Sequence, residues 1–283
     1  MSDNKAILDP GLDSAISING VISRSYTYFM HNFDKFLKLA LGPILMWVAL
    51  EIGSDYFYLE QGKIYDTTVP RAMICAGFAL LWYRQFLMGS EHATYSQLVD
   101  HILAPGVFNL NNLFWSVIRI AITTIVLFVP TLILSISFMV YQYSQGQYLN
   151  EVAIQDIAFK STTMVILLFS PILVRLSLYT VGIALGRREM SLGNVWKKTS
   201  GNTITLWLLI LRAFLPISLY SYFVTWAFSK FATQFDLNYF WEGIVVNLPT
   251  AFFTFMMLAI VVAANGEAFK VIFGIRIAKR EET

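Results

Sequence analysis

Six apolar stretches constrain the fold of this chain more than any other feature of its sequence. Each is close to the roughly 20 residues that an α-helix needs to cross the ~30 Å hydrocarbon core of a bilayer. Because no water reaches the backbone there, each stretch must be helical. The sequence therefore predicts an all-α, polytopic membrane protein with about six transmembrane helices. These are Phe36–Gly53, Val69–Gly89, Phe114–Tyr141, Ser161–Gly186, Ile204–Phe228 and Gly243–Ala264.

Composition supports a membrane protein and excludes several other classes. Apolar residues make up 57% of the 283 residues and charged residues 13%, about half of the roughly 25% charged residues usual in soluble proteins. The net charge of +2 gives no basic surface typical of a nucleic-acid-binding protein. Cys75 is the only cysteine, so an internal disulfide is excluded.

The distribution of lysine and arginine predicts the orientation. With the N-terminus in the cytoplasm, 12 of the 20 basic residues fall on the cytoplasmic side, while the outer loops hold three, Lys63, Lys160 and Lys230. The excess of cytoplasmic cations follows the positive-inside rule. We therefore expect a multi-pass membrane protein with both termini in the cytoplasm.

This orientation predicts three regions along the chain. Residues 1–35 form a cytoplasmic N-terminal amphipathic segment, and residues 269–283 form a basic cytoplasmic tail. The six-span domain occupies residues 36–268, as hairpins 36–89, 114–186 and 204–268.

A threefold pattern runs through the predicted spans. Pro43, Pro130 and Pro216 lie in the first, third and fifth spans at intervals of 87 and 86 residues. An amphipathic stretch precedes each of these spans, at residues 18–29, 95–103 and 192–199. One interpretation is three repeated units, each an in-plane cytoplasmic helix followed by a helical hairpin. The alternative is coincidence, because proline is common in membrane helices.

Arginines within the spans are the most unusual chemical feature. A mid-span arginine costs about 2.5–3.5 kcal/mol on insertion scales, so it normally faces protein, water or a ligand. Glu267 is the best candidate for an intramembrane ion-pair partner. The surplus of cations predicts a binding site for anionic lipid in the cytoplasmic leaflet, and the alternative is that the side chains reach the headgroups by snorkelling. The candidate anion-binding residues are Arg175 and Arg212, which lie deepest, with Arg84 and Arg119.

Catalytic and cofactor sites are not indicated. The three histidines, His31, His92 and His101, lie outside the spans, which argues against a membrane haem and against a base for an intramembrane protease. Glu91–His92 and Asp100–His101 fit a solvated polar face better than a metal site. We therefore expect no catalytic residue, no cofactor and no metal.

Three passages resemble known membrane proteins. Residues 16–45 resemble the opening of bacterial YciC-like inner-membrane proteins, and residues 81–89 and 174–209 resemble segments of small alphaproteobacterial six-span proteins. Asn194 and Val195 stand where glutamate and alanine would be usual. The resemblance implies a location in a bacterial inner membrane and supplies no catalytic residue. The matching positions are Ser191, Leu192, Gly193, Trp196, Gly201 and Asn202.

The sequence thus favours a non-catalytic membrane protein that binds lipid, another membrane protein or both, as an accessory or assembly subunit would. The main alternative is a transporter of a small molecule or lipid, because prolines such as Pro171 and Pro249 could interrupt spans around a midplane site. A lipid-acting enzyme ranks third, since no acid–base pair is evident. No partner other than membrane lipid and membrane protein is indicated.

Overall fold

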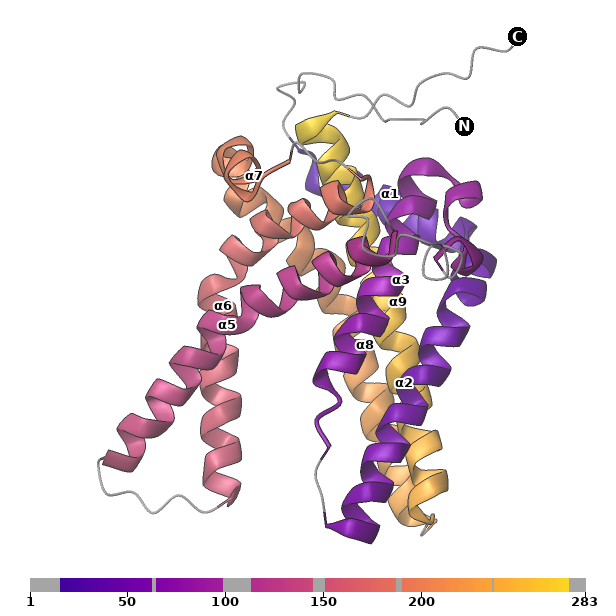
Figure 1. The fold of residues 1–283 in the computed structure, drawn as a ribbon, viewed down its shortest axis with the longest axis vertical. Coiled ribbons are helices and arrows are strands. Elements are labelled where there is room, and N and C mark those ends of the chain that lie inside the picture. Colours follow the sequence, from indigo (N-terminus) through magenta and orange to yellow (C-terminus); the bar gives the residue numbers. More distant parts are fainter. Residues whose placement is uncertain are drawn as a thin grey trace.

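The computed structural model describes residues 16–62, 65–98, 113–144, 151–186, 190–235 and 237–274. Within these ranges the chain is helical apart from short connections and contains no strand, so the all-α prediction is confirmed. Long helices dominate the arrangement (Figure 1). The elements are α1 (Ile18–His31), α2 (Phe33–Gln61), α3 (Thr68–Met88), η1 (Ser90–His92), α5 (Leu113–Ser144), α6 (Glu151–Ala184), α7 (Leu192–Thr199), η2 (Ser200–Asn202), α8 (Thr203–Gln234) and α9 (Tyr239–Phe273).

Four helical segments of the described residues are long and apolar enough to cross a membrane. They are Phe33–Gln61, Leu167–Ala184, Leu192–Gln234 and Tyr239–Phe273. The other two predicted spans lie on α3, which is less apolar because it carries Arg71 and Arg84, and on α5, many of whose side chains are outside the described set. The fold is therefore that of a membrane protein, and the number of six spans stays a prediction.

The helices define two ends of the bundle (Figure 1). We call the end that carries α1 and α7 the interfacial end. The opposite end, where α2 turns into α3 and α8 into α9, is the hairpin end. Long helices run alternately between the two, so residues far apart in the sequence meet at each end.

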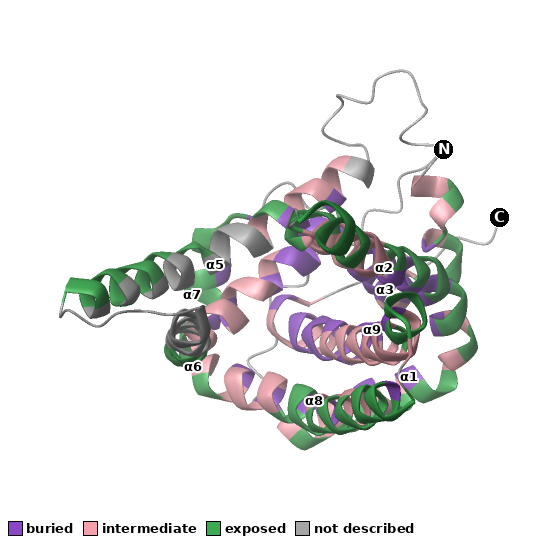
Figure 2. Cartoon of the chain, turned by 90° about the horizontal axis from the view of Figure 1, so that it is seen from below, coloured by how far each residue is buried: buried purple, intermediate pink, exposed green. Residues whose placement is uncertain are grey.

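Helix α9 occupies the centre of the bundle. It contacts α1, α2, α3, α6, α7 and α8, and viewed along the bundle it is enclosed by its neighbours (Figure 2). In lipid no hydrophobic force drives helices together, so their association depends on close packing, which small residues allow. The buried small residues of α9 are Gly243, Ala251, Ala259, Ala263, Ala264, Gly266 and Ala268.

An aromatic cluster packs α2 and α3 against α9. Trp82 of α3 is fully buried, stacks on Phe78 with ring centroids 6.1 Å apart, and meets Phe36 of α2 edge to face. Its indole nitrogen donates a 2.9 Å hydrogen bond to the Ala259 carbonyl of α9. A buried Trp N–H needs such an acceptor, so this contact fixes the register between α3 and α9.

Helices α1 and α7 are short, amphipathic and built alike. In each, a serine caps the N-terminus, a valine four residues on is buried, and a hydroxyl residue four further on is buried and donates to that valine's carbonyl at 2.8 Å. The prediction of helices at 18–29 and 192–199 is confirmed, while the middle stretch is described only to Leu98. The matched residues are Ser17 and Ser191, Val21 and Val195, and Ser25 and Thr199.

An asparagine joins each of these short helices to the long helix that follows. Asn32 has φ −116° and ψ 27° before α2, and Asn202 has φ −116° and ψ 17° before α8. These non-helical angles let the chain turn from the interfacial helix into the long one.

The first long helix is longer than the apolar stretch that predicted it. The stretch ends at Gly53, but α2 continues to Gln61, because Glu51 and Asp55 end the apolar run without ending the helix. Termination comes at Gly62, whose φ of 63° is left-handed, a conformation that glycine adopts at little cost.

Candidate anion-binding site

The candidate site is built on the polar face of α1. Spacings of three and four residues place side chains on one side of a helix, so Arg24, Thr27 and His31 share a face. Val21 and Phe29 are buried on the other side. Helix α1 therefore packs on the bundle through its apolar face and presents a cation and a histidine along its other face.

Glu267 of α9 pairs with two cations at once. Arg24 Nε donates to Glu267 Oε2 at 3.0 Å, and Lys270 Nζ donates to Oε1 at 3.0 Å. The carboxylate side chain is only 13% exposed, whereas Arg24 is 57% and Lys270 37% exposed. Both cations therefore have donors left for a further anion, while the carboxylate between them is largely covered.

A pocket of about 440 Å³ opens between α1, α3 and α9 at this point. The Lys270 Nζ also lies 4.2 Å from the centroid of the Phe86 ring, a cation–π contact that holds the ammonium over α3. Two basic side chains share one carboxylate, so the local charge is positive. The lining residues are Ser23, Arg24, Thr27, Tyr28, His31, Asn32, Phe86, Glu267 and Lys270.

Two further polar groups belong to residues that line the pocket, His31 and Tyr28. The Nδ1 of His31 lies 2.8 Å from the Thr27 carbonyl oxygen; a carbonyl only accepts, so Nδ1 carries the proton and Nε2 is left for another partner. The Tyr28 hydroxyl is buried and has no hydrogen-bond partner among the described residues. Burial raises the pKa of the Tyr28 phenol, and the nearby Gln85 side chain lowers it by a smaller amount. The two side chains do not meet hydrogen-bond geometry.

The four arginines predicted to bind an anion each donate hydrogen bonds to different oxygens of the chain. Arg175 is 6% exposed, donates from Nε to Thr199 Oγ1 at 3.0 Å and from Nη2 to the Trp196 carbonyl, and stacks 3.6 Å from the Trp196 ring centroid. Arg212 is exposed and donates to Asn19 Oδ1 at 3.1 Å.

The remaining two also find oxygen atoms of the chain itself. Arg84 donates to the His92 carbonyl at 2.7 Å, and Arg119 of α5 donates to the Tyr179 hydroxyl of α6 at 3.2 Å. The expected ion-pair partner, Glu267, pairs instead with Arg24 and Lys270. The carboxylate joins α9 to α1 because the C-terminal part of α9 runs directly beside that helix.

Three of these arginines attach interfacial elements to long helices. Arg84 joins α3 to η1, Arg175 joins α6 to α7, and Arg212 joins α8 to α1. Each guanidinium donates to an oxygen at the interfacial end. This hydrogen bond offsets part of the free-energy cost of placing a cation in a long apolar helix.

The sequence did not predict Arg24, His31 and Lys270 as site residues. Arg24 and Lys270 entered only the count of basic residues that sets the orientation, and His31 lies outside the predicted spans. The spacing of Arg24, Thr27 and His31 on one helix face was the available signal. Asp100 and His101, half of the weighed metal site, lie outside the described residues. Among the residues that are described, no group of three or more metal-binding side chains gathers.

Comparisons with protein-family models, curated proteins and solved structures found no match for this chain. Function must therefore be argued from the geometry of the site and the membrane character of the fold.

Proposed function

We propose that this chain is a non-catalytic integral protein of a bacterial inner membrane that binds the phosphate of an anionic lipid in the pocket between α1 and α9. It acts alone or as an accessory subunit of another membrane protein. The observation that carries the proposal is that Arg24 and Lys270 share the single carboxylate of Glu267 while both remain open to the pocket. Basic pockets between membrane helices on the cytoplasmic side bind lipid headgroups.

The membrane setting supports this assignment. With six spans and both termini in the cytoplasm, the interfacial end lies at the cytoplasmic leaflet, where anionic headgroups and the positive-inside rule both favour cations. The resemblance to YciC-like inner-membrane proteins agrees with this location. The described basic residues that this orientation places at the cytoplasmic boundary are Arg24, Lys35, Lys38, Lys197, Lys198 and Lys270.

The shared construction of α1 and α7 supports a repeated unit as part of the same proposal. Ser17, Val21 and Ser25 each lie 174 residues before their counterparts in α7, which is two periods of 87. In this arrangement every unit contributes one interfacial helix to the cytoplasmic face, and among the described residues it is α1 of the first unit whose Arg24 pairs with Glu267 of α9.

The test compares how much phosphatidylglycerol and how much phosphatidylcholine stay bound to the purified full chain, as measured by native mass spectrometry. The double variant Arg24→Gln with Lys270→Gln removes two charges, each worth about 1 kcal/mol toward an anionic surface, so phosphatidylglycerol should bind roughly 30-fold more weakly. Glu267→Gln removes the competing carboxylate and should strengthen binding.

Arg212→Gln is the matched control, because Arg212 is a cation near α1 that contacts Asn19 and does not line the pocket. Its phosphatidylglycerol affinity should equal that of the unmodified chain. Equal affinity in the double variant, or weaker binding in Glu267→Gln, would show that the pocket is not the anion site.

A further inference from the structure

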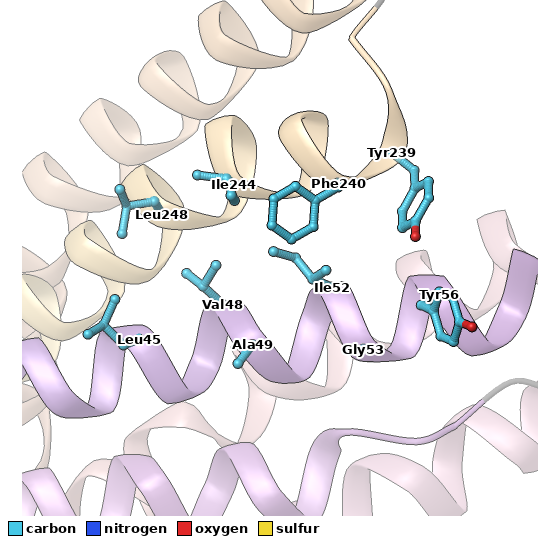
Figure 3. A pocket seen from close by; sticks show the side chains of 10 residues that line it. All are labelled: Leu45, Val48, Ala49, Ile52, Gly53, Tyr56, Tyr239, Phe240, Ile244 and Leu248. Atoms are coloured by element: carbon cyan, nitrogen blue, oxygen red, sulfur yellow. The ribbon is translucent and has the colours of Figure 1, made fainter.

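A second, apolar groove runs along α2 and α9 at the hairpin end (Figure 3). It encloses about 580 Å³. Its floor is closed where the two helices touch, since a Cβ built on Gly243 would lie 2.9 Å from Ile52 Cγ1. Exposed rim residues such as Leu45 (55%) and Leu248 (41%) border it, so the groove is reached sideways from the membrane. Further lining residues are Val48, Ile244, Tyr56 and Tyr239.

The dimensions of the groove fit one lipid tail. From Leu45 to Tyr56 it follows eleven helical steps, about 16 Å at 1.5 Å per residue, which matches the ~15 Å half-thickness of a bilayer core. A transmembrane helix of a partner would need the full ~30 Å. The groove is therefore the size of a hydrocarbon chain within one leaflet.

Polar groups of the groove gather at one end only. Figure 3 shows the Tyr56 and Tyr239 side chains together at that end, with Phe240 and aliphatic side chains along the rest. The ring centroids of the two tyrosines lie 6.4 Å apart. Tyrosines of this kind mark the headgroup level of a membrane. The exposed carboxylates Asp55 and Glu242 lie within one helical turn of them in sequence. That charge disfavours an anionic headgroup and favours one that carries an ammonium.

We infer that this groove holds one acyl chain of a phospholipid with a zwitterionic, amine-bearing headgroup in the leaflet at the hairpin end. The tail lies between α2 and α9, and the headgroup lies at Tyr56 and Tyr239 with its ammonium toward the carboxylates. The site is separate from the anion pocket and does not depend on it.

The experiment uses the full chain in nanodiscs that contain phosphatidylethanolamine with a photoactivatable group in its acyl chain. Labelled residues are mapped by mass spectrometry and should fall on residues 45–56 and 239–248. Gly53→Phe fills the groove without a clash, because nothing lies within 4 Å of a Cβ at Gly53, and it should reduce labelling at least about fivefold. Gly42→Phe is the matched control on the same helix, since Gly42 is equally open and lies outside the groove; its labelling should be unchanged.

Three results would overturn the inference. One is unchanged labelling in Gly53→Phe, and another is equal labelling by a phosphatidylglycerol probe, which would remove the headgroup preference. The third is a disulfide-linked dimer formed through Ala49→Cys in a Cys75→Ser background, because the groove would then be an interface between two copies.

Discussion

Replacing Arg175 with methionine should release α7 from the bundle while leaving the long helices in place. The guanidinium holds α7 through the Thr199 hydroxyl at 3.0 Å, the Trp196 carbonyl and the Trp196 ring at 3.6 Å. Hydrogen bonds from a charged donor contribute about 1.5–3 kcal/mol each, and a desolvated cation–π contact about 2 kcal/mol. Methionine recovers packing and removes the cost of burying a cation, and Thr199 Oγ1 keeps its bond to the Val195 carbonyl.

The free energy needed to open α7 locally should therefore fall by about 2 kcal/mol in Arg175→Met. This change raises the exchange rates of the α7 backbone amides roughly 30-fold. Hydrogen–deuterium exchange of residues 192–199 in detergent micelles measures this directly. Arg175→Lys should give much of the same loss, because an ammonium lacks the planar fork and the flat stacking surface. Arg212→Met is the control, since Arg212 contacts α1. The reasoning is refuted if α7 exchange rises less than about threefold in Arg175→Met, or rises equally in Arg212→Met.

Two further predictions concern local packing and local charge. Gly266→Ala should lower the free energy of unfolding by about 1–3 kcal/mol, because its Cβ would lie 2.7 Å from a Phe86 ring carbon. Gly77→Ala meets nothing within 4 Å and should raise it by about 0.5–1 kcal/mol; thermal unfolding in micelles compares the two, and equal effects would contradict the packing argument. Hydrogen bonds from the Thr68 hydroxyl and backbone N–H hold the pKa of the Asp66 carboxyl below its ordinary value. Its stabilisation of the start of α3 is complete above the unfolded pKa of about 3.9 and is lost as pH falls through the lower folded pKa. An NMR titration of the Thr68 amide should have its midpoint below about 3.9, and Asp66→Asn should abolish it; a midpoint at or above that value would contradict the hydrogen-bond argument.

The elements were predictable where hydrophobicity alone decides them. Long apolar runs must be helical in a bilayer, so α2, α8 and α9 follow from composition, and the periodicity of residues 18–29 and 192–199 gave α1 and α7. The end of α2 was not predictable from apolarity, because the helix passes Glu51 and Asp55 and stops only at the left-handed Gly62.

The candidate site was harder to predict because its contacts join distant parts of the chain. Arg24 and Glu267 are 243 residues apart, and nothing in the local sequence of either residue indicates the other. The depth of Arg175 in its predicted span indicated that it needs a partner, but the partner could equally have been a lipid phosphate. Only the position of α7 across α6 supplies the Thr199 hydroxyl and the Trp196 carbonyl.

The span arginines and the pocket cations therefore play different physical roles. Arg175 is 6% exposed, and its donors are directed at fixed oxygens of the chain, so a ligand would have to displace existing bonds in a site that opens little. Arg24 is 57% exposed and shares its acceptor with Lys270, so an incoming phosphate adds contacts without first removing a buried one. An anion is favoured where cations are both concentrated and still free to donate. An arginine within an apolar stretch stands out in the sequence, but once it is buried its donors are already bound to the chain and it is not available to a ligand. The accessible cations of α1 and α9 are then the better candidate site, and the buried Arg175 holds α7 in position beside the bundle.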